Sequence, residues 1–162
     1  MTSGLCLPCQ CSHEDGEVLK SASTTELVQL AHDNRLKVTR LPAQSLFRVY
    51  ALMICEDVAT GALCAVEGHN HESGYMGGSI CAERSAIGSA AFRNLTRPLI
   101  RHVVISTDST ECIAPGCLCR EYMASFSNAH TQVIVAHTRT MCSQTNRHTY
   151  RAPTSPPSCV PI

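Results

Sequence analysis

Two short stretches decide how this chain folds: SICAERSA, at residues 79–86, and PGCLCRE, at residues 115–121. The first stretch offers one thiolate, Cys81, and the second offers two, so three sulfurs can surround one zinc ion and leave a coordination position open. A water bound at such a position becomes acidic, which is typical of catalytic rather than structural zinc. Glu83, two residues after Cys81, has no evident structural role and is a candidate for moving protons.

The expected metal ligands are Cys81, Cys117 and Cys119, each at a point where a loop is predicted to enter a helix. The partial positive charge of a helix N-terminus favours thiolate over thiol. Three thiolates outweigh the charge of one Zn²⁺ ion. We expect Arg84 and Arg120 to donate hydrogen bonds to the sulfurs without binding the metal themselves, and so to offset the surplus negative charge.

The composition limits the partners of this chain. Its 162 residues suffice for one domain with a single hydrophobic core. The 13 basic and 13 acidic residues balance, so the chain has no excess positive charge to attract nucleic acid. Its four tyrosines and three phenylalanines are few for stacking the bases of a nucleic acid strand. We therefore expect a small, neutral substrate and no nucleic acid. No apolar run reaches the roughly 20 residues that cross a bilayer. The odd count of 11 cysteines and the lack of a secretory signal predict a cytoplasmic protein with reduced thiols and no membrane partner.

Hydrophobic patterning predicts a hairpin followed by alternating strands and helices. The expected elements are a helix at 24–34 behind a capping box at 23–26, strands at 47–55 and 62–66, a helix at 81–92, a strand at 100–106, a helix after Pro115, and a strand at 133–136. This order predicts an α/β fold, in which helices flank both faces of a mixed sheet of about five strands.

The two ends of the chain are expected to lie outside the folded domain, which we place at 23–137. The segment 1–22 contains four possible metal ligands, Cys6, Cys9, Cys11 and His13. They are packed too closely for a complete zinc module, so we expect a mobile tail with reactive thiols. The segment 138–162 is polar and proline-rich, and we expect it to be irregular except for a short strand near 148–151.

Three motifs together resemble those of the cytidine deaminase family, in its small-subunit type. SLFRV at 45–49 is similar to the family's S-x-F-x-V, and GHNHE at 68–72 is similar to its G-x-N-x-E. CAER at 81–84 matches the catalytic segment of the family, whose signature pairs a carboxylate with a cysteine-bound zinc ion. The resemblance extends from about residue 45 to residue 137.

The resemblance implies a three-layer α/β/α fold, a Cys₃-bound zinc ion, and hydrolysis of cytidine or deoxycytidine to the corresponding uridine. Glu83 would carry protons between water, the ring and the departing amine. Phe47 would pack against the pyrimidine, while Asn70 and Glu72 would hold the ribose hydroxyls. The family also implies a homotetramer, or a dimer, whose pockets are completed by neighbouring subunits.

One departure from the family concerns the metal ligands. The family has P-C-x-x-C, whereas here Gly116 occupies the first ligand position and Cys117 follows one residue late. In one account, Gly116 lets the backbone bend so that Cys117 reaches the metal. In the other, the third ligand is missing and the chain is a degenerate deaminase-like protein with a weak or absent zinc site. A second departure is that the family's closing helix is not visible after residue 138.

Two further alternatives remain open on the sequence alone. A deaminase of blasticidin-type cytosine nucleosides would use the same fold, although Asn70 and Glu72 favour an ordinary ribose. A nucleic-acid-editing enzyme would need basic grooves, which the neutral composition does not indicate.

Overall fold

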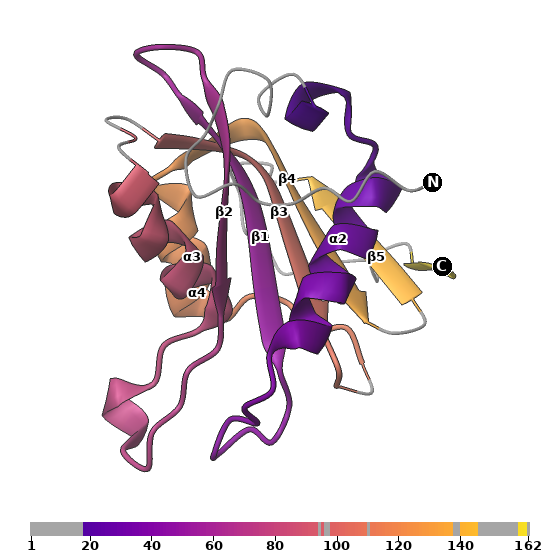
Figure 1. The fold of residues 1–162 in the computed structure, drawn as a ribbon, viewed down its shortest axis with the longest axis vertical. Coiled ribbons are helices and arrows are strands. Elements are labelled where there is room, and N and C mark those ends of the chain that lie inside the picture. Colours follow the sequence, from indigo (N-terminus) through magenta and orange to yellow (C-terminus); the bar gives the residue numbers. More distant parts are fainter. Residues whose placement is uncertain are drawn as a thin grey trace.

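The computed structural model describes residues 18–93, 95, 98–109, 111–137, 140–145 and 159–161. Figure 1 shows one sheet with helices on both faces. The elements are α2 (Thr24–Lys37), β1 (Val49–Asp57), β2 (Leu63–His69), α3 (Ala82–Ala90), β3 (Pro98–Thr107), α4 (Cys117–Ala124), β4 (Ser127–His137), β5 (Thr140–Thr145) and β6 (Cys159–Pro161), with short 3-10 helices at Met76–Gly78 and Ala91–Arg93. The predicted α/β class and three-layer arrangement are confirmed.

Within the described residues the sheet is mixed and has six strands, compared with the expected number of about five, in the order β2-β1-β3-β4-β5-β6. β1 pairs antiparallel with both β2 and β3, whereas β3 and β4 are parallel. The carboxyl ends of β3 and β4 therefore lie side by side at the same end of the sheet, where Thr107 lies opposite His137. Loops that leave such an end commonly carry the functional residues of α/β proteins.

The segment after residue 138 departs from the expectation of irregular chain. β5 pairs antiparallel with β4, and β6 pairs with β5, so both strands extend the sheet. Backbone hydrogen bonds can join such strands whatever their side chains. A polar segment can therefore form a strand without the alternation of apolar and polar residues from which strands are predicted. The short strand predicted near 148–151 lies outside the described residues.

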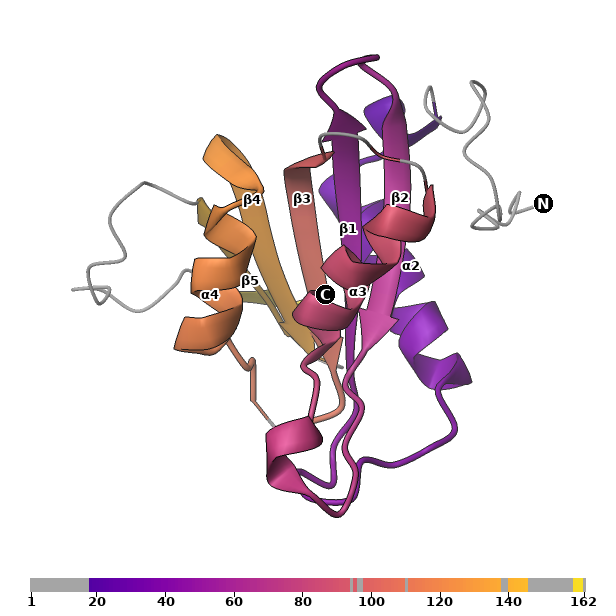
Figure 2. The same cartoon turned by 90° about the vertical axis from the view of Figure 1, so that its left-hand side faces the viewer.

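Two hydrophobic layers cover the two faces of the sheet, and the side chains of β1 alternate between them. Ala51, Met53 and Cys55 face α3 and α4, whereas Leu52 and Ile54 face α2. This alternation is the period of two that a strand imposes on its side chains. Figure 2 shows α3 and α4 on one side of the sheet and α2 on the other.

The helix α2 begins at the predicted capping box. The Ser23 hydroxyl accepts a hydrogen bond from the Glu26 N–H, and the Glu26 carboxylate accepts one from the Ser23 N–H. Residues 18–21 are also helical, and Leu19 packs into the same hydrophobic layer as α2. The folded part of the chain therefore begins before residue 23, and only residues 1–17 of the expected mobile tail lie outside the described residues. Among the helices described, none combines the length and apolar character that a membrane crossing requires.

Gly68 lets α3 lie directly against β2. A Cβ atom at this position would be 2.3 Å from the Ala86 nitrogen and 2.6 Å from the Ala82 carbonyl oxygen, both of which belong to the helix backbone. Because backbone atoms cannot rotate away as side chains do, the sheet accepts α3 at this distance only with glycine at position 68.

We predict that Gly68→Ala lowers the free energy of unfolding by about 1–3 kcal/mol, because the added methyl group must push α3 away from β2. Gly88→Ala is the matched control, since a Cβ at Gly88 meets nothing within 4 Å and alanine favours the helix by roughly 1 kcal/mol. Urea unfolding measures both changes. Equal stability of Gly68→Ala and the parent chain would contradict this close packing.

Candidate metal centre

The N-termini of α3 and α4 bring the two sequence motifs together on one face of the sheet. Cys81 is the N-cap residue of α3, and Gly116 is the N-cap residue of α4. The two helices pack against each other in the same layer. Their partial positive charges therefore act on the same region, which favours anionic groups there.

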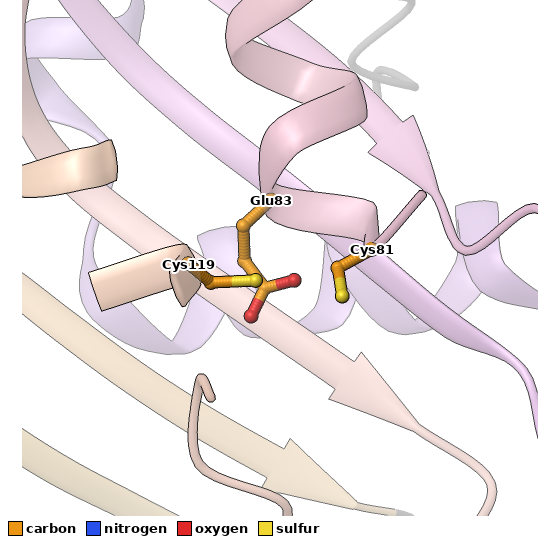
Figure 3. Close-up of side chains that lie close together, drawn as sticks. All are labelled: Cys81, Glu83 and Cys119. Carbon is orange, nitrogen blue, oxygen red and sulfur yellow. The ribbon is translucent and has the colours of Figure 1, made fainter. Parts of the chain in front are cut away.

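Three side chains converge between these helices, as Figure 3 shows. The sulfurs of Cys81 and Cys119 and a carboxylate oxygen of Glu83 all lie within 4.8 Å of one another. Glu83 is 5% exposed and Cys119 is 2% exposed, whereas Cys81 is open to solvent. Among the described residues this is the one group of three potential ligands that could hold a metal ion.

Cys117 is not part of this group, and its side chain is exposed. Cys117 and Cys119 both lie within α4, where two residues correspond to a turn of about 200°. Two such side chains point to nearly opposite sides of a helix. The spacing C-x-C therefore presents one of its sulfurs to Glu83 and the other to solvent.

The backbone at Gly116 does not bend in the way that the first account of the motif requires. Its φ of −64° and ψ of 164° are ordinary extended values that any residue adopts. A Cβ atom at this position would meet nothing within 4 Å. Gly116 thus leaves open space at the N-terminus of α4, and Cys117 does not join the group.

Hydrogen bonding and burial set the charges of the group. A hydrogen bond from Cys119, supported by Arg84, lowers the pKa of Cys81 to about 5. The bond to Cys81 and burial raise the pKa of Cys119, while burial and the nearby Cys81 thiolate raise the pKa of Glu83. Three neighbouring acids do not all ionise readily in a mostly buried site without a cation, because each negative charge disfavours the next.

The two arginines of the motifs differ in their described contacts. Arg84 donates from Nη2 to the Cys81 sulfur at 3.6 Å and to the Ser79 carbonyl oxygen at 3.3 Å. Arg84 thus has the contact that the sequence predicted for it. Arg120 follows Cys119 on α4, and its contact with sulfur stays a prediction.

The donors that are present suit zinc. Thiolate and carboxylate are both common zinc ligands, with bonds of about 2.0–2.3 Å. Two sulfurs on one ion are thus separated by no more than about 4.6 Å, close to the observed spacing within this group. The three side chains can therefore hold one zinc ion with small adjustments and leave a fourth position open.

The thiols elsewhere in the described structure have other environments. Cys55 is buried in the sheet, and burial raises its pKa to about 12. Cys112 donates a hydrogen bond to the Val135 carbonyl oxygen at 3.7 Å. Cys64 is disulfide-bonded, so the expectation that all thiols are reduced is wrong at this position.

The side chains expected to bind ribose hold the loop that carries Phe47. Glu72 accepts hydrogen bonds through Oε2 from the N–H groups of Gln44, at 2.7 Å, and Ser45, at 2.8 Å. Asn70 accepts from the Val49 N–H at 2.8 Å and donates to the Phe47 carbonyl oxygen at 3.0 Å. Phe47 is half-buried at the centre of this loop. The two motifs 45–49 and 68–72 are therefore joined to each other directly.

Asp108 is a third anchor of this loop that the sequence analysis did not identify. It accepts from the Arg48 N–H at 2.5 Å and from Arg48 Nε at 2.7 Å, and it pairs with the buried Arg35 at 3.4 Å. Leu46 has a φ of 60°, in the left-handed region, and this backbone conformation costs about 1–2 kcal/mol. The contacts of Asp108 help to offset that conformational free energy. The only signal in the sequence was its place directly after a buried strand.

We predict that Asp108→Asn lowers the free energy of unfolding at neutral pH by about 2 kcal/mol, because it leaves Arg35 buried without its charge partner. Burial opposes ionisation of Asp108, but the bonds from Arg48 and the charge of Arg35 bring its pKa below the usual value. The stabilisation is therefore present above the unfolded pKa of about 3.9 and is lost as the pH falls through the folded pKa.

Urea unfolding between pH 7 and pH 3 measures the difference in unfolding free energy between the parent chain and Asp108→Asn. This difference should shrink as the carboxylate of the parent chain becomes protonated. Asp33→Asn is the matched control, since Asp33 is exposed on α2 and accepts a hydrogen bond from the neutral amide of Gln29. A constant difference across the whole pH range would show that the charge of Asp108 is not responsible.

We also predict that Cys119→Ser weakens zinc binding by more than the roughly 10–100-fold that the loss of an outer-shell partner costs, whereas Cys117→Ser leaves zinc binding nearly unchanged. The reason is that Cys119 faces the group and Cys117 faces solvent. Competition with a chromogenic chelator gives both affinities. Equal losses in the two variants would place Cys117 at the metal.

Comparisons with known proteins agree with this architecture. No family model matches the chain, and no curated protein matches its sequence. A cytidine deaminase from Burkholderia pseudomallei matches in structure with a TM-score of 0.64 at 22% identity, over 76% of this chain and 93% of that one. Cytidine deaminases from Mycobacterium tuberculosis and Mycobacterium leprae both match with a TM-score of 0.54, at 16% and 18% identity, over 69% of this chain and 85% and 87% of theirs. The chain therefore has the cytidine deaminase-like fold.

Proposed function

We propose that this chain is a zinc-dependent hydrolase that deaminates cytidine or deoxycytidine to the uridine nucleoside and ammonia. One observation carries the proposal: a buried carboxylate, Glu83, lies beside two cysteine sulfurs where two helices of a deaminase-like fold converge. Zinc supports this chemistry as a Lewis acid that makes water a nucleophile near neutral pH. The amidine carbon of a cytosine ring is the matching electrophile.

Glu83 would move the protons of this reaction. Hydrolytic deamination requires a base that takes a proton from water and an acid that protonates the ring nitrogen and the departing amine. One carboxyl group can do both in turn. Because Glu83 is almost wholly buried, bulk water would not compete for the proton it carries.

The loop at 44–49 and its anchors support a nucleoside as the substrate. Phe47 would pack against the pyrimidine at the centre of this anchored loop. Glu72 uses Oε2 for both of its bonds to the loop, and we propose that Oε1 takes a ribose hydroxyl. Asn70 is 9% exposed and already bonded on both sides of its amide. Its contribution to ribose binding would therefore come chiefly through the position it gives the loop.

A second candidate function is a non-catalytic, deaminase-like protein. The observation in its favour is the open space at Gly116 together with the exposed position of Cys117, which leaves two sulfurs rather than three at the group. Such a protein would keep the fold and bind zinc weakly or not at all. The two candidates differ in whether the zinc-loaded chain turns over a nucleoside.

We further propose a homotetramer, or a dimer. Leu118 and Tyr122 support an assembly, because they are four residues apart on α4 and are 59% and 41% exposed. Apolar side chains in this arrangement form one exposed stripe on the helix.

We predict that the purified chain with saturating zinc lowers the ultraviolet absorbance of cytidine or deoxycytidine and releases ammonia in equal amount. Glu83→Gln should reduce this turnover at least about 100-fold at saturating zinc, because an amide cannot carry the protons. Absence of turnover in well-folded, zinc-loaded protein would contradict the enzyme proposal and favour the non-catalytic protein.

A further inference from the structure

Gly116 leaves space for a side chain at the N-terminus of α4, the helix that carries Cys119. Residues three apart on a helix share a face, so a side chain at position 116 would stand on the same face as that of Cys119. Nothing within 4 Å occupies the place of its Cβ atom. The N-terminus of α4 therefore has room for a further side chain on the face that carries Cys119, and Gly116 supplies none.

Glu83 is the third donor that is actually present. Its carboxylate extends from the first turn of α3, and in Figure 3 one of its oxygens lies between the sulfurs of Cys81 and Cys119. All three donor atoms lie within 4.8 Å of one another, and Glu83 is 5% exposed. Of the other described cysteines, Cys117 is exposed and Cys112 donates to β4, so neither completes the group.

We infer that Glu83 is a metal ligand in the resting protein and takes the coordination position that Gly116 leaves empty. The ligand set is then two thiolates and one carboxylate, with the fourth position open. This set carries the same total charge as three thiolates, and Arg84 partly offsets it through its bond to the Cys81 sulfur. The inference rests on the proposed function only in taking zinc as the ion.

A carboxylate bound to the metal is not free to carry protons. If the chain is a deaminase, Glu83 must therefore leave the metal before it can act as a base, and that step slows turnover. A cysteine at position 116 would hold the metal in its place and release Glu83. Gly116→Cys is thus expected to strengthen zinc binding and to raise any turnover that the chain has.

A double-variant cycle on zinc affinity tests the inference without any substrate. The four proteins are the parent chain, Glu83→Gln, Gly116→Cys and the double variant, each titrated with zinc against a chromogenic chelator. In the parent chain, Glu83→Gln should weaken zinc binding by more than the roughly 10–100-fold that the loss of an outer-shell partner costs. In the Gly116→Cys background the same substitution should weaken it much less, because the effects of residues that share a site are not additive. An equal effect in both backgrounds, or none in the parent chain, would overturn the inference.

Cobalt substitution gives a second reading if Glu83→Gln does not fold. The sulfur-to-cobalt charge-transfer absorption per ion should rise by about one half in Gly116→Cys, as three thiolates replace two. No rise would overturn the inference, because the parent site would then already hold three sulfurs or the new cysteine would not reach the ion. Gly88→Cys is the control for a cysteine remote from the group.

The outcomes separate this inference from the proposed function. Coupling between Glu83 and position 116 without turnover of cytidine would support the ligand set and contradict the deaminase proposal. Turnover without that coupling would support the deaminase and remove Glu83 from the resting metal site.

Discussion

The close packing of α3 on β2 is the constraint on which the rest of the structure depends. Gly68 allows the backbones of the helix and the strand to approach, and this places the first turn of α3 beside that of α4. Cys81 and Cys119 meet because both helices begin at the same end of the sheet. A helix displaced by one methyl group would move Glu83 with it, since Glu83 lies in the first turn of α3.

Electrostatics then explain why this arrangement calls for a cation. Two sulfurs and a carboxylate share a mostly buried site, and the net charge of the chain is zero, so no general positive field compensates them. The helix N-termini and Arg84 supply partial compensation close by. A divalent ion would balance the rest, which is why the same residues suit metal binding better than a metal-free resting state.

The loop at 44–49 shows how polar side chains can build a binding element before any ligand arrives. Asn70 and Glu72 come from the segment after β2, Asp108 directly follows β3, and all three bond to the backbone of the loop. Together they hold Leu46 in a left-handed conformation that the loop alone would avoid. Binding to such a loop costs less ordering entropy than binding to a mobile one.

The sequence by itself determined the layers and the hairpin, which follow from local periodicity, and the capping box of α2, which follows from capping chemistry. It also determined that Cys81 and Cys119 lie close together, because both belong to motifs that resemble those of a known family. It did not determine the strand at 140–145, whose pairing is a backbone property, or the clamp formed by Asp108, whose partners are 60 and 73 residues away in the chain. Two accounts of Cys117 were compatible with its spacing. Only the tertiary structure separated them, because the direction of a side chain depends on where α4 begins and how it packs, and neither is encoded in a local pattern.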